Sequence, residues 1–438
     1  MTKTSNLNLI TKKICELFEY TIPGEWGIEG DPENDIPVLR STNFTNEGRI
    51  DYSNLAFRKI DPKRLALRLV NKGTILIEKS GGSPSQPAGR VVYCDEDFNG
   101  SASNFIEIAK TNNLFCPKYV FFLLHHLYQI GLVLKYQQQT TGIINFKLEQ
   151  YKNEEVLLPR DRKEQTQIAA ILSTIDRAIE QTEAIIAKQQ RIKTGLMQDL
   201  LTKGIDEDGN VRSDATHKFK DSPLGQIPTA WEAKTIGGIL NEYGGKLQTG
   251  PFGSQLHASE YVAEGIPFVM PQDIQNSGIS EVNIARITEE RANDLARHRM
   301  LPGDIVFARR GDLSRCAVVK EYQKGWVCGS GCFLMKPPKE SISPRWITEV
   351  YRYYTTQLQV NVQAVGSTMV NLNKGILASL YIPFPTHREQ VQIEERLNDM
   401  EKDQIKLWQQ LDKLKCSKIG LMQDLLTGNV RVTALLND

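Results

Sequence analysis

Apolar residues recur along two stretches of the chain in an alternating four-three step. In the second stretch the apolar positions run from Ile393 to Leu425, and the matching stretch runs from Ile168 to Leu200. A four-three alternation held over five turns or more predicts a coiled-coil helix. The apolar positions predicted on the two helices are Ile168, Leu172, Ile175, Ile186, Leu196, Leu200, Ile393, Leu397, Met400, Leu407, Leu411, Leu414, Leu421 and Leu425.

The same two stretches carry identical motifs. Gly195-Leu-Met-Gln-Asp-Leu-Leu201 recurs as Gly420-Leu-Met-Gln-Asp-Leu-Leu426, and Glu164-Gln-x-Gln-Ile168 recurs as Glu389-Gln-x-Gln-Ile393. Both recurrences share one offset of 225 in residue number, whereas solenoid repeats have periods of roughly 20–50 residues. The chain is therefore a duplication of a whole unit, and each copy is a globular domain followed by a helix about 55 Å long.

Two pairs of glycines mark the predicted helices. Gly204 and Gly428 follow the apolar pattern, where a helix commonly ends in the left-handed conformation. Gly195 and Gly420 lie inside the pattern, where each costs roughly 1 kcal/mol relative to alanine. Their recurrence predicts the close approach of another backbone, and a tolerated accident is the alternative.

The apolar stripes can be buried in two ways. A single amphipathic helix most often packs on its own domain. Because this chain has two helices of equal length, the stripes can also pair with each other. We expect an antiparallel coiled coil with an internal pseudo-two-fold relation, which would hold two globular units at a fixed distance.

The globular segments repeat more weakly, at a second constant offset in residue number. Ile36-Pro-Val-Leu39 matches Ile266-Pro-Phe-Val269, and Gly73-x-Ile-Leu-Ile77 matches Gly303-x-Ile-Val-Phe307. A shared scaffold with divergent loops is typical of two binding modules with different specificities.

The fold class predicted for both globular segments is α/β (α+β). The apolar triplets at 75–77 and 305–307 predict buried strands, and the segments Phe115 to Tyr136 and Pro344 to Leu358 predict helices. Residues 204–222 are rich in Gly, Asp, Ser and Lys, which predicts a surface linker. The expected organisation is a first domain at 1–160, a helix at 161–203, the linker at 204–222, a second domain at 223–387 and a C-terminal helix at 388–430.

Composition narrows the class of protein. A chain of 438 residues with 40% apolar content can form two or three domains with cores. No apolar run reaches the length of a membrane span, which needs about 18 residues, and no charged-then-apolar amino terminus predicts a secretory signal. Seven cysteines without a CxxC pair indicate a reducing cytoplasm. Cys316, Cys328 and Cys332 are disfavoured as metal ligands, because zinc sites need closer pairs and a fourth ligand.

The sequence lacks the motifs of common active sites. Gly244-Gly-Lys246 lacks the upstream glycine of a phosphate-binding loop, and HExxH and GxSxG are absent. Pro337-Pro338 lacks the flanking residues of an amino-methyltransferase motif. His125 and His126 lie in an apolar helix, where core histidines are commoner than ligands. These features predict a binding protein and not a catalyst.

Basic residues gather near equivalent turns of the two domains. The net charge of +1 is weak for a nucleic-acid-binding protein, and a solvated face explains such clusters equally well. Two modules on a rigid support nevertheless suit a bipartite DNA target. The clusters are Arg58, Lys59, Lys63, Arg64, Arg68 and Lys72 in the first domain, and Arg297, His298, Arg299, Arg309, Arg310, Arg315 and Lys320 in the second.

With these motifs the chain resembles the specificity (S) subunit of type I restriction–modification systems over essentially its full length. The resemblance rests on the order domain, helix, domain, helix and on the repeated Glu-Gln-x-Gln-Ile and Gly-Leu-Met-Gln-Asp-Leu-Leu strings. It also rests on Ile227-Pro-x-x-Trp231 at the start of the second domain, and Ile22-Pro-Gly-Glu-Trp26 resembles a compressed version of that opening motif.

The resemblance implies a non-catalytic subunit that binds double-stranded DNA. Each target-recognition domain would recognise one half of a split sequence, and the coiled coil would set the spacer between the halves. Two methyltransferase (modification) subunits would dock on it, and two restriction (nuclease/translocase) subunits would complete the complex. S-adenosylmethionine, ATP and Mg would bind those partners, and no cofactor is expected on this chain.

Two alternatives stay open, a stand-alone sequence-specific DNA-binding protein and a divergent DNA methyltransferase or nuclease. Candidate DNA contacts lie on the turn after the central strand of each domain, because basic and polar side chains there suit phosphates and base edges. They are Lys79, Ser80, Ser83, Arg90, Arg309, Arg310, Ser314 and Arg315, followed by Thr141, Asn145, Ser367 and Asn371, whose recurrence suits a shared structural turn equally well.

Overall fold

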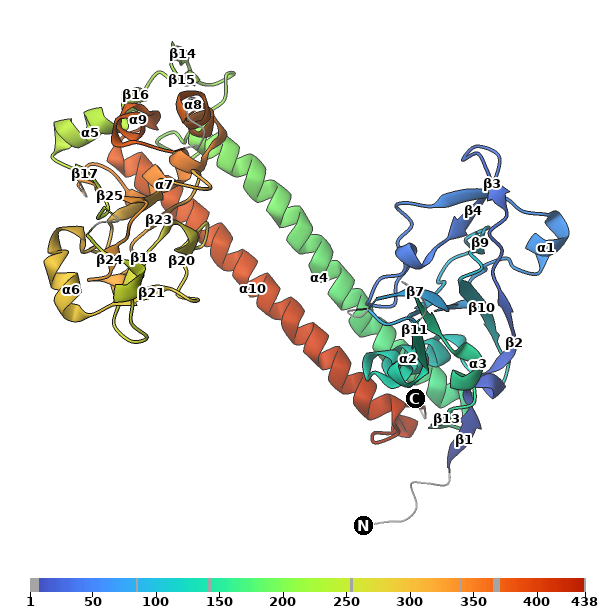
Figure 1. The fold of residues 1–438 in the computed structure, drawn as a ribbon. Helices are drawn as coiled ribbons and strands as arrows, with labels where there is room; N and C mark the ends of the chain where they lie inside the picture. Colours follow the sequence, from blue (N-terminus) through green and yellow to red (C-terminus); the bar gives the residue numbers. More distant parts are fainter. Residues whose placement is uncertain are drawn as a thin grey trace. The chain divides into compact units, whose positions relative to one another are not determined.

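The computed structural model describes residues 8–83, 86–139, 143–252, 255–338, 340–364 and 371–436. The chain divides into two compact units (Figure 1). Unit 1 comprises residues 1–185 and 407–438, and unit 2 comprises residues 186–406. Each unit therefore contains one globular body and a part of each long helix.

The two bodies contain the same central sheet of four antiparallel strands. Its order is β2-β10-β6-β8 in unit 1 and β17-β25-β22-β23 in unit 2. The strands are β2 (Phe18–Pro23), β6 (Ile75–Glu78), β8 (Val91–Tyr93), β10 (Ile106–Thr111), β17 (Lys246–Thr249), β22 (Ile305–Ala308), β23 (Cys316–Val318) and β25 (Cys332–Lys336). The equal order confirms that the duplication extends through the globular bodies.

A second sheet also recurs, with one parallel pair in each body. Its order is β3-β5-β4-β9 in unit 1 and β21-β18-β24 in unit 2, with β4 parallel to β9 and β18 parallel to β24. These strands are β3 (Ile28–Glu29), β4 (Ile36–Leu39), β5 (Ala56–Lys59), β9 (Ser101–Ala102), β18 (Ile266–Val269), β21 (Ala285–Ile287) and β24 (Val327–Cys328). The two units thus share a mixed α/β architecture.

A two-stranded antiparallel ribbon precedes each long helix. β1 (Leu9–Lys13) pairs with β13 (Glu155–Pro159), and β16 (Glu232–Thr235) pairs with β26 (Tyr381–Phe384). The shorter elements are α1 (Pro62–Ala66), β7 (Ser80–Gly82), β11 (Gln137–Gln139), β12 (Ile144–Phe146), α3 (Leu148–Tyr151), α5 (Ile236–Tyr243), β19 (Ile274–Gln275), β20 (Gly278–Ile279), α6 (Glu289–Asp294) and α9 (Lys374–Ser379).

The central strands β6 and β22 form the middle of each core. Ile75, Leu76 and Ile77 are fully buried, as are the equivalent residues 305–307, so both predicted strands are confirmed. Each predicted helix is instead divided in two. Gly131 adopts a left-handed conformation (φ 79°) between α2 (Pro117–Gln129) and a 3-10 turn, and Tyr353 is extended between α7 (Pro344–Arg352) and α8 (Tyr354–Ala364).

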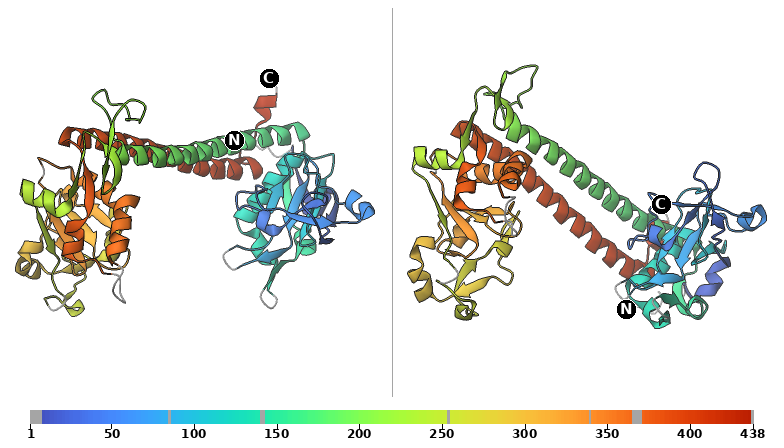
Figure 2. Two further views of the ribbon diagram at one scale, coloured as in Figure 1. Left: turned by 90° about the horizontal axis from the view of Figure 1, so that it is seen from above. Right: turned by 45° about the horizontal axis from the view of Figure 1, so that its top comes forward.

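The long helices α4 (Arg162–Thr202) and α10 (His387–Leu426) pair in antiparallel orientation within each unit (Figures 1 and 2). In unit 1 Lys418 lies 2.7 Å from Asp176 and Lys415 lies 3.0 Å from Glu183. In unit 2 Lys193 lies 3.2 Å from Glu401. Residue numbers rise along α4 as they fall along α10, and this confirms the antiparallel pairing.

The predicted stripe contacts both the partner helix and the globular body. All fourteen predicted apolar positions are buried or half-buried. At the head of α10, Ile393 and Leu397 belong to the core of unit 2 together with Leu200 from the tail of α4. Unit 1 has the equivalent arrangement, with Ile168 and Leu425 in its core. Both ways of burying the stripe are therefore used.

The glycines of the helices behave in two ways. Gly204 (φ 63°) and Gly428 (φ 76°) adopt the left-handed conformation after α4 and α10, as predicted. No other atom of the described chain lies within 4 Å of a Cβ added at Gly195 or Gly420. The predicted close approach of another backbone is therefore wrong for the described residues.

Each long helix begins with a buried glutamate that is paired with an arginine. Glu389 accepts hydrogen bonds from Arg212 (2.5 and 3.1 Å), from the Trp231 indole (3.0 Å) and from the Ile205 amide (2.9 Å). In unit 1, Glu164 accepts hydrogen bonds from Arg431 at 2.5 and 2.7 Å. Each arginine follows the tail of the other long helix.

The glutamine after each glutamate fixes the helix head to the body. Gln165 accepts a hydrogen bond from the Cys116 amide and donates one to the Pro159 carbonyl, both at 2.8 Å. Gln390 accepts a hydrogen bond from the Ser343 amide at 2.8 Å, and both glutamines are fully buried. A buried amide that has both partners satisfied is stabilising, and this explains why the Glu-Gln pair recurs.

The predicted linker at 204–222 packs on unit 2. Ile205 is 2% exposed, and Arg212 is held by Glu389. The end of the segment forms β14 (Phe219–Ser222), which pairs with β15 (Gly225–Pro228). Most of the segment is exposed or half-buried, as expected of a surface linker, and it also supplies donors to the buried Glu389 carboxylate from Arg212 and the Ile205 amide.

The segment Ile22–Trp26 is not a second copy of the opening motif. Trp231 is fully buried against Glu389. Gly24 donates a backbone hydrogen bond to Ile106 at the start of β10, just as Gly250 does to the first residue of β25. Trp26 therefore corresponds to the residue two positions after Gly250, at the end of a central-sheet strand.

Replacing Glu389 by Gln removes the charge that faces Arg212. We expect the free energy of unfolding of unit 2 to fall by about 3 kcal/mol, because one half of a buried ion pair loses its partner. Urea unfolding of the full chain, followed by tryptophan fluorescence, measures the change. The matched control is Glu395→Gln on the exposed face of α10, with an expected change within about 0.5 kcal/mol. Equal unfolding midpoints for both variants would contradict the role of Glu389.

Candidate nucleic-acid interface

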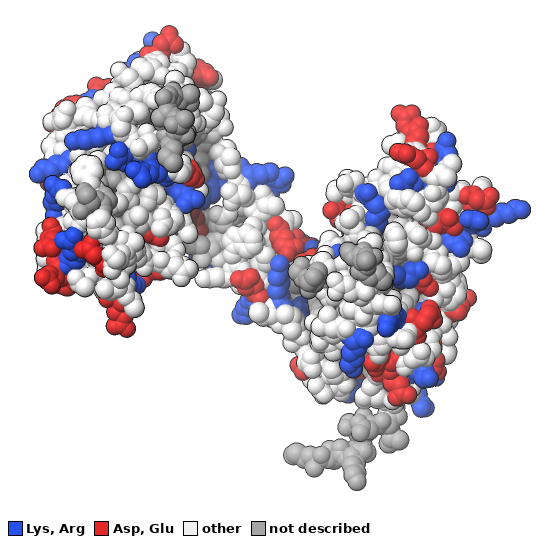
Figure 3. Space-filling model, viewed as in Figure 1, with Lys and Arg blue, Asp and Glu red and all other residues white. Residues whose placement is uncertain are grey.

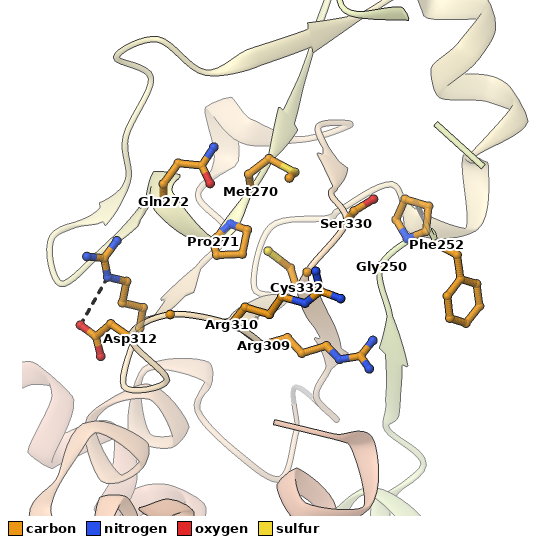
Figure 4. Close-up of a pocket in the computed structure, with 14 residues that line it drawn as sticks. Gly250, Phe252, Met270, Pro271, Gln272, Arg309, Arg310, Asp312, Ser330 and Cys332 are labelled. Atoms are coloured by element: carbon orange, nitrogen blue, oxygen red, sulfur yellow. Dashed lines mark hydrogen bonds and ion pairs between the residues drawn. The ribbon is translucent and has the colours of Figure 1, made fainter. Parts of the chain in front are cut away.

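Unit 2 contains a cleft of about 560 Å³ beside the end of β22 (Figure 4). The turn 309–315 after β22 forms one wall, and the segments after β17, after β18 and before β25 form the others. The cleft is lined by Gly250, Pro251, Phe252, Met270, Pro271, Gln272, Arg309, Arg310, Gly311, Asp312, Arg315, Ser330, Gly331 and Cys332.

Two of the three arginines in this cleft are held by other groups of the chain. Arg309 donates from Nε to the Asn371 side chain and the Leu372 carbonyl, both at 3.2 Å. Arg315 donates from Nε to Asp312 at 3.4 Å. The Ser314 hydroxyl donates to Asp312 at 2.6 Å, and chiefly this bond holds the pKa of Asp312 below its usual value. Asp312 is therefore an anion at neutral pH.

Arg310 is the arginine whose guanidinium is free within the described part of the chain. Its side chain is exposed, and its backbone forms a bridge with Asn371 directly after β22. A cationic side chain on a fixed backbone, with its donors unused, is suited to bind an anionic or acceptor-rich ligand.

The equivalent turn of unit 1 presents different chemistry. Lys79 lies 3.0 Å from Glu107. Ser80 is 7% exposed and donates to the Asn145 side chain at 2.6 Å. Ser83 is half-buried and forms a backbone bridge with Gln86. The shared scaffold therefore places a free cation on the turn of unit 2 and engaged polar groups on the turn of unit 1.

Arg90 does not fit a direct contact with DNA. Its side chain is 8% exposed and pairs with the fully buried Glu78 at 2.7 Å. It also donates to the carbonyls of Phe44 and Ser41. The sequence placed Arg90 beside a Gly-rich turn, but β8 begins at the next residue and carries Arg90 into the interior.

The second-rank candidates favour a structural role. Asn145 pairs opposite Ser80, and Asn371 forms the bridge opposite Arg310, so the two asparagines occupy equivalent positions beside the turn. Thr141 and Ser367 lie outside the described residues. Ser314 bonds to Asp312 and supports the turn itself.

In Figure 3 positive side chains form a band across the middle of unit 2, with negative side chains mainly toward its edges, whereas the two signs are interspersed on unit 1. Several arginines of the predicted basic clusters have partners within the chain, such as Arg299 at 2.5 Å from Glu289 and Arg58 stacked on Trp26 at 3.9 Å. The predicted clusters are therefore partly engaged by partners within the chain.

The buried histidines and cysteines belong to the cores. His125 is 1% exposed and stacks on Phe121, and burial lowers the pKa of His125 to about 3, as for a core histidine. Cys316, Cys328 and Cys332 are buried as free thiols.

Over the residues with a described structure, no three His, Cys, Asp or Glu side chains meet in a group that could hold a metal ion. In the same residues, no helix has the length and apolarity needed to cross a membrane.

Two bodies of equal central-sheet order, each followed by a long helix, define a protein built from two copies of one module. The family model described as the type I restriction modification DNA specificity domain matches residues 10–189 and 228–415. The chain belongs to this family of type I restriction–modification specificity subunits and carries the specificity domain twice.

Relatives of similar length have the same family name. The chain is 24% identical over 416 residues to the type I restriction enzyme MjaVIII specificity subunit of Methanocaldococcus jannaschii, covering 93% of this chain and 89% of the relative. It is 27% identical over 434 residues to the putative MjaX specificity subunit of the same organism, covering 96% and 93%.

Solved structures share the fold over the whole chain. A crystal structure of a type I restriction-modification system S subunit from M. genitalium is similar with a TM-score of 0.55 and 16% identity, covering 97% of this chain and 98% of that chain. A chain from a structure on complex assembly and conformational transition of the type I R-M system is similar with a TM-score of 0.58 and 15% identity, covering 98% and 100%.

Sequence reasoning missed Arg212 and Arg431, which hold the helix heads. The signal was present, because Gly209-Asn-Val-Arg212 recurs as Gly428-Asn-Val-Arg431. The offset of this repeat is smaller than the offset of the helices, so a search at one fixed offset passes over it.

Replacement by alanine separates the structural arginine from the candidate ligand-binding one. Arg90→Ala should lower the free energy of unfolding of unit 1 by about 3–5 kcal/mol, because the buried Glu78 carboxylate is left unpaired. Arg310→Ala should change stability by no more than about 0.5 kcal/mol. Urea unfolding of both variants tests the assignment, and comparable losses would show that the two turns were assigned incorrectly.

Proposed function

We propose that this chain recognises a bipartite DNA sequence for a type I restriction–modification complex and catalyses no reaction itself. Each body would bind one half of the target. The observation that carries the proposal is that two bodies of equal strand order present different side chains at one equivalent turn, Ser80 in one and Arg310 in the other. Equal scaffolds with different contact groups suit two unlike half-sites.

Lys79, Ser83, Arg309, Arg310 and Arg315 are the candidate contacts that we retain. Lys79 and Ser83 flank the short strand β7 that follows β6, and Arg309, Arg310 and Arg315 follow β22; none of the five is fully buried. Within the described residues, Arg309 and Arg315 each bond through Nε, so their terminal guanidinium nitrogens remain open to a ligand. Such donors suit phosphate oxygens, which position a protein on the duplex without specifying sequence.

The long helices would dock the partner subunits and set the spacer. Large apolar side chains are exposed on them, including Ile192 and Ile405 in unit 2 and Trp408 and Ile419 in unit 1. Exposed apolar residues on a helix pair suit the packing of further helices. The proposed partners are two methyltransferase subunits and two restriction subunits, which would bind S-adenosylmethionine, ATP and Mg and would act in the cytoplasm.

Exchange of residues 215–387 for the equivalent segment of a relative tests the separation of the two half-sites. We expect one half-site to change and the other to persist, because Arg212 and Glu389 both remain in the host chain and keep the helix head intact. The measurement is the map of methylated bases in cells that contain the chimaera and the methyltransferase subunits. The matched control exchanges the body of unit 1 and should change the other half-site.

A chimaera that alters both half-sites at once would contradict independent recognition. Methylation that needs no S subunit would contradict the proposed role altogether. Specific DNA binding by the chain alone, without copurifying methyltransferase subunits, would instead favour a stand-alone DNA-binding protein.

Insertion of one heptad into each long helix tests the spacer. The insertions belong after Gln190 and after Gln404, because these side chains hydrogen-bond to each other across the helix pair. Seven residues lengthen a helix by about 10 Å, which is about three base pairs of duplex. We expect unchanged half-sites separated by a longer spacer.

The control inserts the heptad after Gln190 alone, which places the two helices out of register and should abolish methylation. Methylation at the original spacing by the double insertion would show that the helices do not set the separation.

A further inference from the structure

Position 310 of unit 2 is structurally equivalent to position 80 of unit 1. Both residues follow a buried central strand, β22 or β6, and both lie opposite an asparagine. In unit 1 this position is Ser80, which is nearly buried and bonded to Asn145. In unit 2 it is Arg310, an exposed side chain with no hydrogen bond or ion pair to the residues that the structure describes. The two copies therefore share this backbone position and differ in the side chain that it carries.

The surroundings of Arg310 favour a base edge over a phosphate. Gln272 and Ser330 contribute uncharged polar groups to the same cleft, and Phe252 contributes an aromatic ring that is 60% exposed. Asp312 also lines the cleft and stays ionised through its bonds to Ser314. Arg309 and Arg315 are anchored in the same cleft and suit phosphate oxygens, which leaves the free Arg310 beside these uncharged polar groups to meet a base edge.

Guanine is the base that a free guanidinium matches. Its O6 and N7 accept two parallel hydrogen bonds from one arginine in the major groove, and no other base offers two acceptors there. The backbone of Arg310 is fixed by β22 on one side and by the bridge to Asn371 on the other, so little backbone freedom is lost on binding.

We propose that Arg310 recognises a guanine in the half-site bound by unit 2, and that unit 1 makes no equivalent contact because Ser80 occupies the position. The proposal rests on the proposed function of the chain. The side chains at the equivalent positions 80 and 310 then determine part of the difference between the two half-sites.

The experiment uses the complex of the full chain with its methyltransferase subunits and the DNA target defined by methylation mapping. Each guanine of the unit 2 half-site is replaced in turn by 7-deazaguanine, which lacks the N7 acceptor. We expect the wild-type complex to bind about tenfold more weakly at one position, as expected when one of two specific hydrogen bonds is lost. Arg310→Ala should bind the natural target about 10–100-fold more weakly and should lose the sensitivity at that position.

Arg315→Ala is the matched control, since it removes an arginine of the same cleft that Asp312 already holds. It should keep the wild-type sensitivity to 7-deazaguanine. The converse variant Ser80→Arg should leave the sensitivity of the unit 2 half-site unchanged.

Three results would overturn the proposal while leaving the proposed function intact. One is a unit 2 half-site without a guanine. Another is a wild-type complex that tolerates every 7-deazaguanine. The last is an Arg310→Ala variant that weakens binding evenly across sequences with a shallower salt dependence, which would assign Arg310 to a phosphate. Failure of the proposed function is a different observation, namely the absence of S-subunit-dependent methylation at a bipartite site.

Discussion

The structure depends on a buried carboxylate at the head of each long helix. Glu389 and Glu164 each lie where a helix begins, and each is neutralised by an arginine that follows the tail of the other helix. Removing two charges from water is costly unless the pair is close and its remaining hydrogen-bonding groups are satisfied. Glu389 meets both conditions through Arg212, Trp231 and Ile205, and Glu164 meets them through Arg431 and Val432. The body, the helix head and the opposing helix tail are thereby fixed to one another within each unit.

The residues that follow β6 and β22 take no part in these two ion pairs. Backbone pairing holds position 80 or 310 beside an asparagine, and the side chain at that position differs between the two copies of the scaffold. Arg90 illustrates the opposite case, because its guanidinium saturates Glu78 and two carbonyls inside unit 1. A specificity subunit needs this separation, since new targets must arise by substitution on a scaffold that continues to assemble.

The sequence predicted the features that have a fixed period or an exact repeat. The helices, their apolar stripe and their glycine ends could be predicted because a heptad depends only on local spacing. The buried triplets of β6 and β22 could be predicted because a short apolar run before a Gly-containing turn is also a local pattern. The burial and the partners of individual side chains could not be predicted in this way. Arg90 and Arg315 each stand one residue before a short strand, β8 or β23, yet Arg90 is buried against Glu78 whereas Arg315 is half-buried and held by Asp312.

Other failures came from contacts between distant residues. The segment 204–222 has the composition of a linker, yet Ile205 belongs to the core of unit 2 and Arg212 pairs with the buried Glu389. Trp26 and Trp231 both follow an Ile-Pro pair, but only Trp231 faces a buried carboxylate. Gly195 and Gly420 recur without any crowding in the described chain, and the structure gives no internal reason for their recurrence.

The most direct test of recognition by two unlike modules is single-molecule sequencing of methylated bases in a genome that carries this chain with its methyltransferase subunits. The account predicts one asymmetric motif of two different half-sites separated by a spacer of constant length and free sequence, which disappears when the gene for this chain is deleted. A continuous or palindromic motif, or a motif that persists after the deletion, would contradict it.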